Sequence, residues 1–234
     1  MVFKKSIRDK ITTQKQMSDS LLLNLLLAFS GGFQDAYTYI VRDKVFANAQ
    51  TGNIVLMSTH FMVGNYGKGI RYLFPIFSFM LGIFIADTIQ YKFKNAQILH
   101  WRQGIVLAEA AIMLIVGFLS QEHNMLANCM ISFSCAMQLL SFKKVHSNPY
   151  TSTMCIGNLK SGVSAFSAYL RSRNAIDLNK ALDYFVVILV FAFGSGFGGN
   201  LSLLFNEKTI WISACLLIVG TIMMDFDRKP SHKS

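Results

Sequence analysis

Eight apolar runs follow one another along the 234-residue chain, and they constrain the fold more than any other feature. A helix needs about 20 mostly apolar residues to cross a bilayer, and most of these runs are near that length. The connections between them are short, so no additional soluble domain of ordinary size is expected. The pattern predicts an all-α integral membrane protein with a single membrane domain over 20–225. The runs cover residues 20–41, 46–64, 72–91, 103–120, 124–142, 150–170, 181–205 and 209–224.

The composition agrees with a membrane location. Apolar residues make up 53% of the chain and charged residues only 15%, whereas a soluble domain has about 25% charged residues. The mean hydropathy of +0.41 argues against an ordinary soluble enzyme. The net charge of +10 comes from basic residues scattered over short loops, without a basic patch interleaved with aromatic residues. We therefore expect the lipid bilayer as a partner and no nucleic acid.

The runs repeat in the order strong, weak, strong, short. Residues in the second half match residues in the first half about 104 or 105 positions earlier. This self-similarity predicts two repeats, over about 20–120 and 124–224. The matching residues are Gln34 with Gln138, Phe46 with Tyr150, Gly52–Asn53 with Gly157–Asn158 and, at a larger offset, Gly82 with Gly196.

The basic residues predict how the chain crosses the bilayer, because short cytoplasmic loops are enriched in Lys and Arg. If all eight runs cross, 13 basic residues are inside, 8 are outside, and Lys160 is left in the bilayer. If the weak runs 46–64 and 150–170 enter and return, 17 are inside and 5 are outside. The second arrangement is favoured. It predicts six crossings, cytoplasmic tails at 1–19 and 226–234, and two repeats of opposite orientation.

The weak runs contain two segments that are too polar to face lipid, 47–53 and 151–158. Irregular backbone at membrane depth needs cover from protein or water, and helix N-termini there can offer N–H groups to an anionic or dipolar solute. If a solute site lies between the segments, Asn53 and Asn158 are close together and line one polar cavity. Otherwise the glycines serve close helix packing and the asparagines join helices by hydrogen bonds. The candidate solute-binding residues are Asp35, Gln50, Thr51, Gly52, Asn53, Gly157 and Asn158.

Four carboxylates lie inside apolar runs, where ionisable residues are costly: Asp35, Asp87, Glu109 and Asp183, the last near the start of its run. Asp35 and Glu109 are therefore candidates for proton or cation coupling. The alternative role is structural, as a hydrogen-bonding group. For Asp35 an ion pair with Arg42 or Lys44 is a further structural alternative, because both cations follow it within a few residues.

Residues that carry metal or enzymatic chemistry form no recognised pattern in the sequence. The five histidines show no His-Glu-x-x-His spacing, and there is no Gly-x-Ser-x-Gly elbow. We expect no catalytic residue, no metal ligand and no cofactor. The cysteines lack Cys-x-x-Cys spacing and are expected to be buried thiols that act as small apolar groups. They are Cys129, Cys135, Cys155 and Cys215.

Two sets of motifs resemble a known family. On these motifs the chain resembles the YoaK-like bacterial membrane proteins, classed as a domain of unknown function, over about residues 20–225. The resemblance implies about six crossings of the bacterial inner membrane, and it implies no activity and no site residue. The first set is 31–39 with 46–53, and the second is 136–138, 141–145, 149–150, 152–155 and 157–159.

A small-solute or ion transporter or channel fits the inverted repeats and the paired polar segments best. The alternative is a membrane protein that assembles or interacts with others without transport, and a membrane enzyme is less favoured. Carrier and channel remain open alternatives, as do monomer and homo-oligomer.

Overall fold

The computed structural model describes residues 21–93, 101–142, 144–145, 148–149 and 155–226, and this part of the chain is almost entirely helical. The basic tails predicted at 1–19 and 226–234 lie outside it, apart from Phe226. The prediction of an all-α fold is confirmed. The helices are α2 (Leu21–Val41), α3 (Gln50–Met62), α4 (Tyr66–Phe93), α5 (Trp101–Val116), α6 (Asn124–Ser141), α7 (Cys155–Ser172), α8 (Ala175–Phe205) and α9 (Ile210–Phe226).

Each of these helices falls on one of the eight apolar runs. Short 3-10 turns, η2 (Gln121–His123) and η3 (Asn206–Thr209), lead into α6 and α9. Two short strands, β1 (Lys144–Val145) and β2 (Asn148–Pro149), pair antiparallel after α6. The start of α8 has a clear local cause, because the Asn174 side chain accepts a hydrogen bond from the N–H of Ile176 at 3.0 Å.

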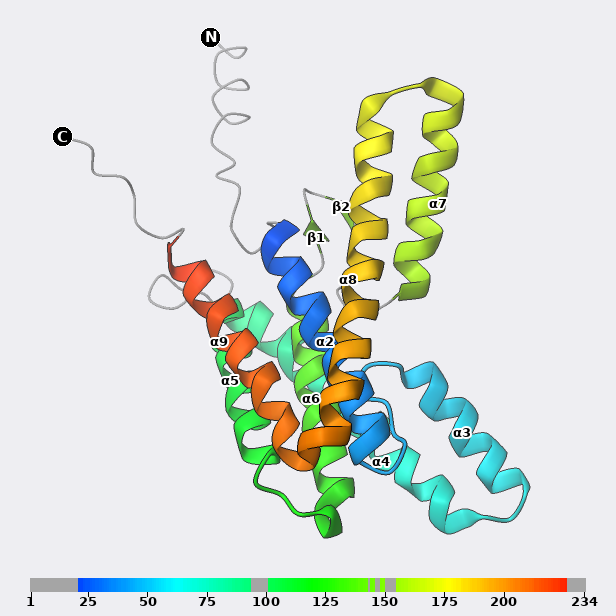
Figure 1. The fold of residues 1–234 in the computed structure, drawn as a ribbon, viewed down its shortest axis with the longest axis vertical. Helices are drawn as coiled ribbons and strands as arrows, with labels where there is room; N and C mark the ends of the chain where they lie inside the picture. The colour runs from blue at the N-terminus through cyan, green and yellow to red at the C-terminus, as the bar shows by residue number, and fades with distance from the viewer. Residues whose placement is uncertain (1–20, 94–100, 143, 146–147, 150–154, 227–234) are drawn as a thin grey trace, which may run out of the picture.

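The helices pack as a central group with two projecting hairpins (Figure 1). In the central group α5 packs against both α6 and α9, and α2 packs against α9. Their apolar side chains form the main core, which includes Leu27, Met113, Ile131 and Leu217. The hairpins are α3 with α4 and α7 with α8, and they join the central group because α4 packs against α6 and α8 packs against α2.

Glycines allow the closest of these helix contacts. A Cβ added to Gly194 on α8 would overlap the carbonyl of Phe29 on α2, and one added to Gly82 on α4 would overlap the carbonyl of Phe133 on α6. Gly196, which the sequence paired with Gly82, has nothing within 4 Å of its added Cβ. Gly194 therefore has a close-packing role like that of Gly82, whereas Gly196 does not.

The surface suits a lipid environment. Among the described residues, two helical stretches are long and apolar enough to cross a membrane, Tyr66–Phe93 and Ala175–Met224. Both carry large exposed apolar side chains, including Phe84 on α4 and Phe193 on α8, which are 69% and 73% exposed. An apolar surface of this extent marks contact with a membrane or with another protein.

The cysteines differ from the expectation of four buried thiols. Only Cys135 is buried, Cys129 and Cys155 are half-buried, and Cys215 is exposed on α9. All four are free. The exposure of Cys215 follows from helix periodicity, because α9 buries its neighbour Ala214 and turns Cys215 to the outside.

The glycine contact between α2 and α8 is testable by adding a single methyl group. We expect Gly194→Ala to lower stability by about 1–3 kcal/mol, because the methyl group must displace the backbone of Phe29. Gly196→Ala on the same helix should instead leave stability unchanged or raise it by up to about 1 kcal/mol, since alanine favours a helix over glycine. The apparent melting temperatures of the detergent-purified proteins provide the comparison, and equal values for both variants would contradict the packing argument.

Candidate solute-binding cavity

A cavity of about 940 Å³ lies where the two polar segments begin their helices. It is bounded by α2, the loop between α2 and α3, the first residues of α3 and α7, and one side of α8, with Phe79 from α4. Aromatic and aliphatic groups form most of its wall, and a few polar groups interrupt them. Its polar lining residues are Asp35, Tyr39, Asn48, Gln50, Thr51, Cys155, Ser195 and Asn200.

Asp35 holds the loop of the first polar segment against α2. Its Oδ1 accepts a hydrogen bond from the backbone N–H of Asn48 at 2.6 Å. The Asn48 side chain in turn donates to the carbonyl of Gly31 at 3.3 Å. Asp35 is 6% exposed and still lines the cavity. Its main partner is thus a backbone amide, and the ion-pair alternative with Arg42 or Lys44 does not describe the structure.

Arg42 is bound elsewhere and is fully buried. Its guanidinium donates to the carbonyls of Val116 and Leu119 at 3.0 and 2.9 Å, and to the Asn124 side chain at 2.9 Å. The carbonyls at the end of α5 lack partners within their own helix, and they carry the negative end of the helix dipole. Arg42 therefore caps α5 and fixes the end of α2 to the turn between α5 and α6.

Asn53 ties the first turn of α3 to the loop. Its Oδ1 accepts from the N–H of Phe46 at 2.9 Å, and its Nδ2 donates to the carbonyl of Phe46 at 2.7 Å and to Gln50 Oε1 at 3.0 Å. Asn53 is fully buried and is not among the cavity-lining residues. Gly52 packs against the ring of Phe46 and leaves room for it. Both residues thus hold α3 to its own preceding loop, rather than joining it to another helix.

The second polar segment contributes the start of α7. Cys155, Ile156 and Gly157 line the cavity, whereas Asn158 is buried and does not. Residues 150–154, which include the first half of the second polar segment, lie outside the described part of the chain. The structure thus brings together four of the seven candidates at one cavity: Asp35, Gln50, Thr51 and Gly157.

Glu109 lies away from this cavity, in a buried polar cluster between α2, α5, α6 and α9. Its carboxylate accepts from Gln34 Nε2 at 3.1 Å. It also accepts from the amide nitrogen of Gln138 at 2.8 Å, in the amide orientation that satisfies both groups. Gln34 further donates to Ser213 at 2.9 Å and accepts from the Cys135 thiol at 2.8 Å. This network satisfies a carboxyl group that is fully buried.

The sequence analysis missed the α8 wall of the cavity. On α8, Gly194 and Gly198 pack closely against α2. Gly196 and Gly199 line the cavity instead. The spacing could have separated these two roles. Gly194 and Gly198 are four residues apart and share one face of a helix, whereas Gly196 is two residues from each and lies on another face.

The cavity has the features of a site for a small solute. Small-molecule sites are concave, mostly apolar and carry a few placed polar groups. Within the described ranges no group of three or more His, Cys, Asp or Glu is placed to hold a metal ion. The concave, mostly apolar geometry of the cavity points to binding of a small molecule.

The fold and the cavity define a helical protein with membrane-like helices, and comparison with known families assigns it further. Residues 23–223 match the family described as a protein of unknown function, DUF1275, and the chain belongs to that family. The expectation of a family of unknown function is confirmed, and the narrower YoaK-like name stays a prediction. No curated protein and no solved structure matches the chain.

The role of Asn53 is testable by truncation. We expect Asn53→Ala to lower stability by about 1 kcal/mol or more, because the N–H and carbonyl of Phe46 both lose their side-chain partner. Ser58→Ala, on the exposed part of the same helix, is the control and should change stability little. Thermal denaturation in detergent measures both. An Asn53→Ala protein as stable as the control would show that the tie to Phe46 is dispensable.

Proposed function

We propose that the protein is a transporter or channel for a small solute in the bacterial inner membrane, without enzymatic activity. The proposed solute site is the cavity between the starts of α3 and α7. The observation that carries the proposal is that two polar segments, from opposite halves of the chain, begin their helices at this one cavity. From there α3 and α7 run toward opposite ends of the molecule (Figure 1).

This arrangement matches the physics of a membrane-embedded site. A chain that enters the bilayer and starts a helix at mid-depth exposes irregular backbone, which must be covered by protein or line an aqueous cavity. Discontinuous helices of this kind form the solute sites of many transporters. Asn48 offers a hydrogen-bond acceptor to a bound solute. It lines the cavity, and its buried Oδ1 has no hydrogen-bond partner in the described part of the chain.

The packing of the helices supports an inverted repeat. We pair α2 to α5 of the first repeat with α6 to α9 of the second, in order. The contact of α2 with α8 then corresponds to that of α6 with α4, and the contact of α3 with α4 to that of α7 with α8. The contact of α2 with α9 corresponds to that of α6 with α5, and α5 contacts its own equivalent, α9. These larger contacts are thus unchanged when the repeats are exchanged, whereas the small contact of α4 with α5 has no equivalent of its size between α8 and α9.

Individual residues support the same pairing. Gln34 and Gln138, which match at an offset of 104, both hydrogen-bond the one carboxylate of Glu109. Phe29 and Phe133 differ by the same offset, and each receives a glycine of the opposite repeat against its carbonyl. We propose that Glu109, held between the two repeats, is the coupling residue for a proton or a cation, and that Asp35 contributes from the cavity.

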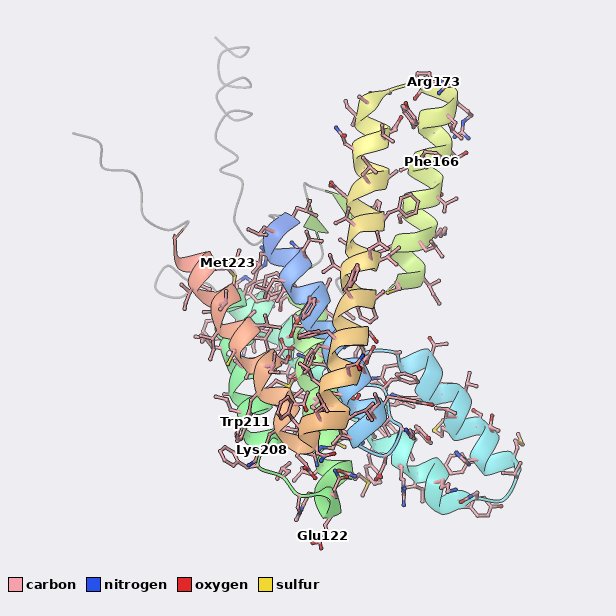
Figure 2. The ribbon with its side chains drawn as sticks, viewed as in Figure 1. Glu122, Phe166, Arg173, Lys208, Trp211 and Met223 are labelled. Carbon is pink, nitrogen blue, oxygen red and sulfur yellow. The ribbon has the colours of Figure 1, made fainter. Side chains whose placement is uncertain are left out.

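The proposed topology has six crossings, by α2, α4, α5, α6, α8 and α9, with both termini in the cytoplasm. In Figure 2, Glu122 and Arg173 lie at opposite ends of the molecule. Glu122 belongs to the turn between α5 and α6, and Arg173 to the turn between α7 and α8. The six-crossing topology puts Glu122 outside, whereas eight crossings would put it inside.

A labelling experiment separates the two topologies. On a background without the four native cysteines, we expect Glu122→Cys to react with a membrane-impermeant maleimide added to intact cells. Arg173→Cys should react only after the membrane is opened, because this turn is cytoplasmic in both topologies. Protection of Glu122→Cys in intact cells, together with reaction after opening, would favour eight crossings and contradict the proposed re-entrant segments.

Solute flux tests the cavity itself. A small-metabolite library is first screened for compounds that raise the melting temperature of the purified protein, because a ligand of the native state stabilises it. Uptake of each such compound is then measured in proteoliposomes. We expect Gly196→Leu to reduce uptake by about tenfold or more, since its side chain enters the cavity without touching other atoms at its Cβ.

The matched control is Gly67→Leu. Gly67 is also helical, also has open space at its Cβ, and does not line the cavity, so this variant should keep its uptake. Equal uptake by both variants would place the solute path elsewhere. Absence of both a stabilising compound and any uptake would contradict transport altogether and favour an assembly or interaction role.

A further inference from the structure

A second, smaller cavity lies at the end of the molecule where α2 ends and α4 begins. Its volume is about 420 Å³. It shares only Ile40 with the larger cavity and is otherwise built from different residues. Four segments that are distant in sequence meet there, namely the end of α2, the end of α3, the first turns of α4 and the turn η2.

Positive charge dominates the lining of this second cavity. Lys44, Lys68 and Arg71 line it, with His60 beside them, and the one acidic group in the lining is Asp43. Asp43 faces Arg71 at 3.8 Å, too long for a hydrogen bond, and both side chains are partly exposed. One carboxylate therefore leaves an excess of two positive charges without counting His60.

In the described part of the chain, Lys44 and Lys68 form no ion pair with an acidic side chain. Among the described residues, none hydrogen-bonds or forms an ion pair with the Lys68 ammonium group. The ammonium of Lys44 lies over the ring of Tyr39, 5.0 Å from its centre. His60 stacks on Tyr72 with ring centres 5.9 Å apart, which fixes the imidazole at the cavity wall.

The backbone supports the same reading. Asp43 and Lys44 both adopt a left-handed conformation, with φ of 62° at each. Residues other than glycine rarely adopt this conformation, and strain of this kind concentrates at functional sites. Here it turns the chain sharply after Arg42 and directs Lys44 to the same cavity as the cations of α4.

We propose that this second cavity binds a phosphate-type anion, either the headgroup of an anionic phospholipid or a soluble phosphate compound. Lys68 and Arg71 contact the phosphoryl oxygens, Lys44 closes the site from the opposite side, and His60 and Gln121 offer further polar groups. Lysine and arginine bind phosphoryl oxygens, whether of a lipid headgroup or of a free phosphate, through charge-assisted hydrogen bonds. Arginine adds the planar pair of donors that suits phosphate geometry. This site is separate from the proposed solute cavity, and its test does not depend on whether the protein transports a solute.

The test uses the full-length protein in a neutral detergent and follows its melting temperature. One arm adds inorganic phosphate against chloride at equal ionic strength. The other adds phosphatidylglycerol against phosphatidylcholine in mixed micelles. We expect the wild-type protein to be stabilised in at least one arm. In that arm the concentration giving half of the effect should rise about tenfold for Lys68→Glu, because a repulsive charge replaces a donor.

The control is Lys208→Glu. Lys208 is an exposed lysine of η3 at the same end of the molecule, near Glu122 in Figure 2, and it does not line the second cavity. This variant should respond as the wild type does. Lys68→Gln provides a milder change, and it should melt as the wild type does without ligand, since Lys68 is exposed.

The two arms identify the source of the phosphate. Stabilisation by phosphatidylglycerol alone indicates a lipid headgroup, and stabilisation by inorganic phosphate indicates a soluble ligand. Either result supports the site if Lys68→Glu weakens this stabilisation as expected and Lys208→Glu leaves it unchanged. The proposal is overturned if neither arm stabilises the wild-type protein, or if Lys68→Glu responds like the control.

Discussion

Contact between helix backbones is the constraint on which the arrangement depends. The α2–α8 pair meets at Gly32, Gly194 and Gly198, and the α4–α6 pair meets at Gly82. In the membrane location proposed above, the hydrophobic effect supplies little attraction between helices, so close packing at small residues and hydrogen bonds must hold the pairs together. These two pairs attach the projecting hairpins to the central group, and the larger cavity forms beside one of them (Figure 1).

Buried polar groups join further pairs of helices, in addition to the glycine contacts. Arg42 joins α2 to the end of α5, and the Gln34–Glu109–Gln138 cluster joins α2, α5 and α6. Such groups are costly in an apolar interior unless each finds a partner. Here each finds several, so the polar residues fix which helices meet and in what register. Burial alone therefore does not single out a transport residue in this protein.

Under the proposed repeat, the two halves of the chain differ in their chemistry. The residue 104 positions after Asp35 is Leu139, so the carboxylate that faces the cavity is present only once. Ser213 stands 104 positions after Glu109, and it takes part in the same cluster. A cavity between such halves has one polar and one less polar side. If the cavity is the solute site proposed above, this asymmetry gives a bound solute a preferred orientation.

The sequence by itself determined the helices, because each helix falls on an apolar run whose length and periodicity indicate a helix. It also indicated that polar segments following α2 and α6 would matter, since Gly52–Asn53 and Gly157–Asn158 are too polar for lipid. Only the tertiary structure decided which of these residues reach the cavity. Asn53 turns inward to the backbone of Phe46, and Gly196 on α8 lines the wall, while its neighbour Gly194 packs on α2. The physical reason is that a side chain's direction depends on helix rotation and on partners distant in sequence, which local patterns do not encode.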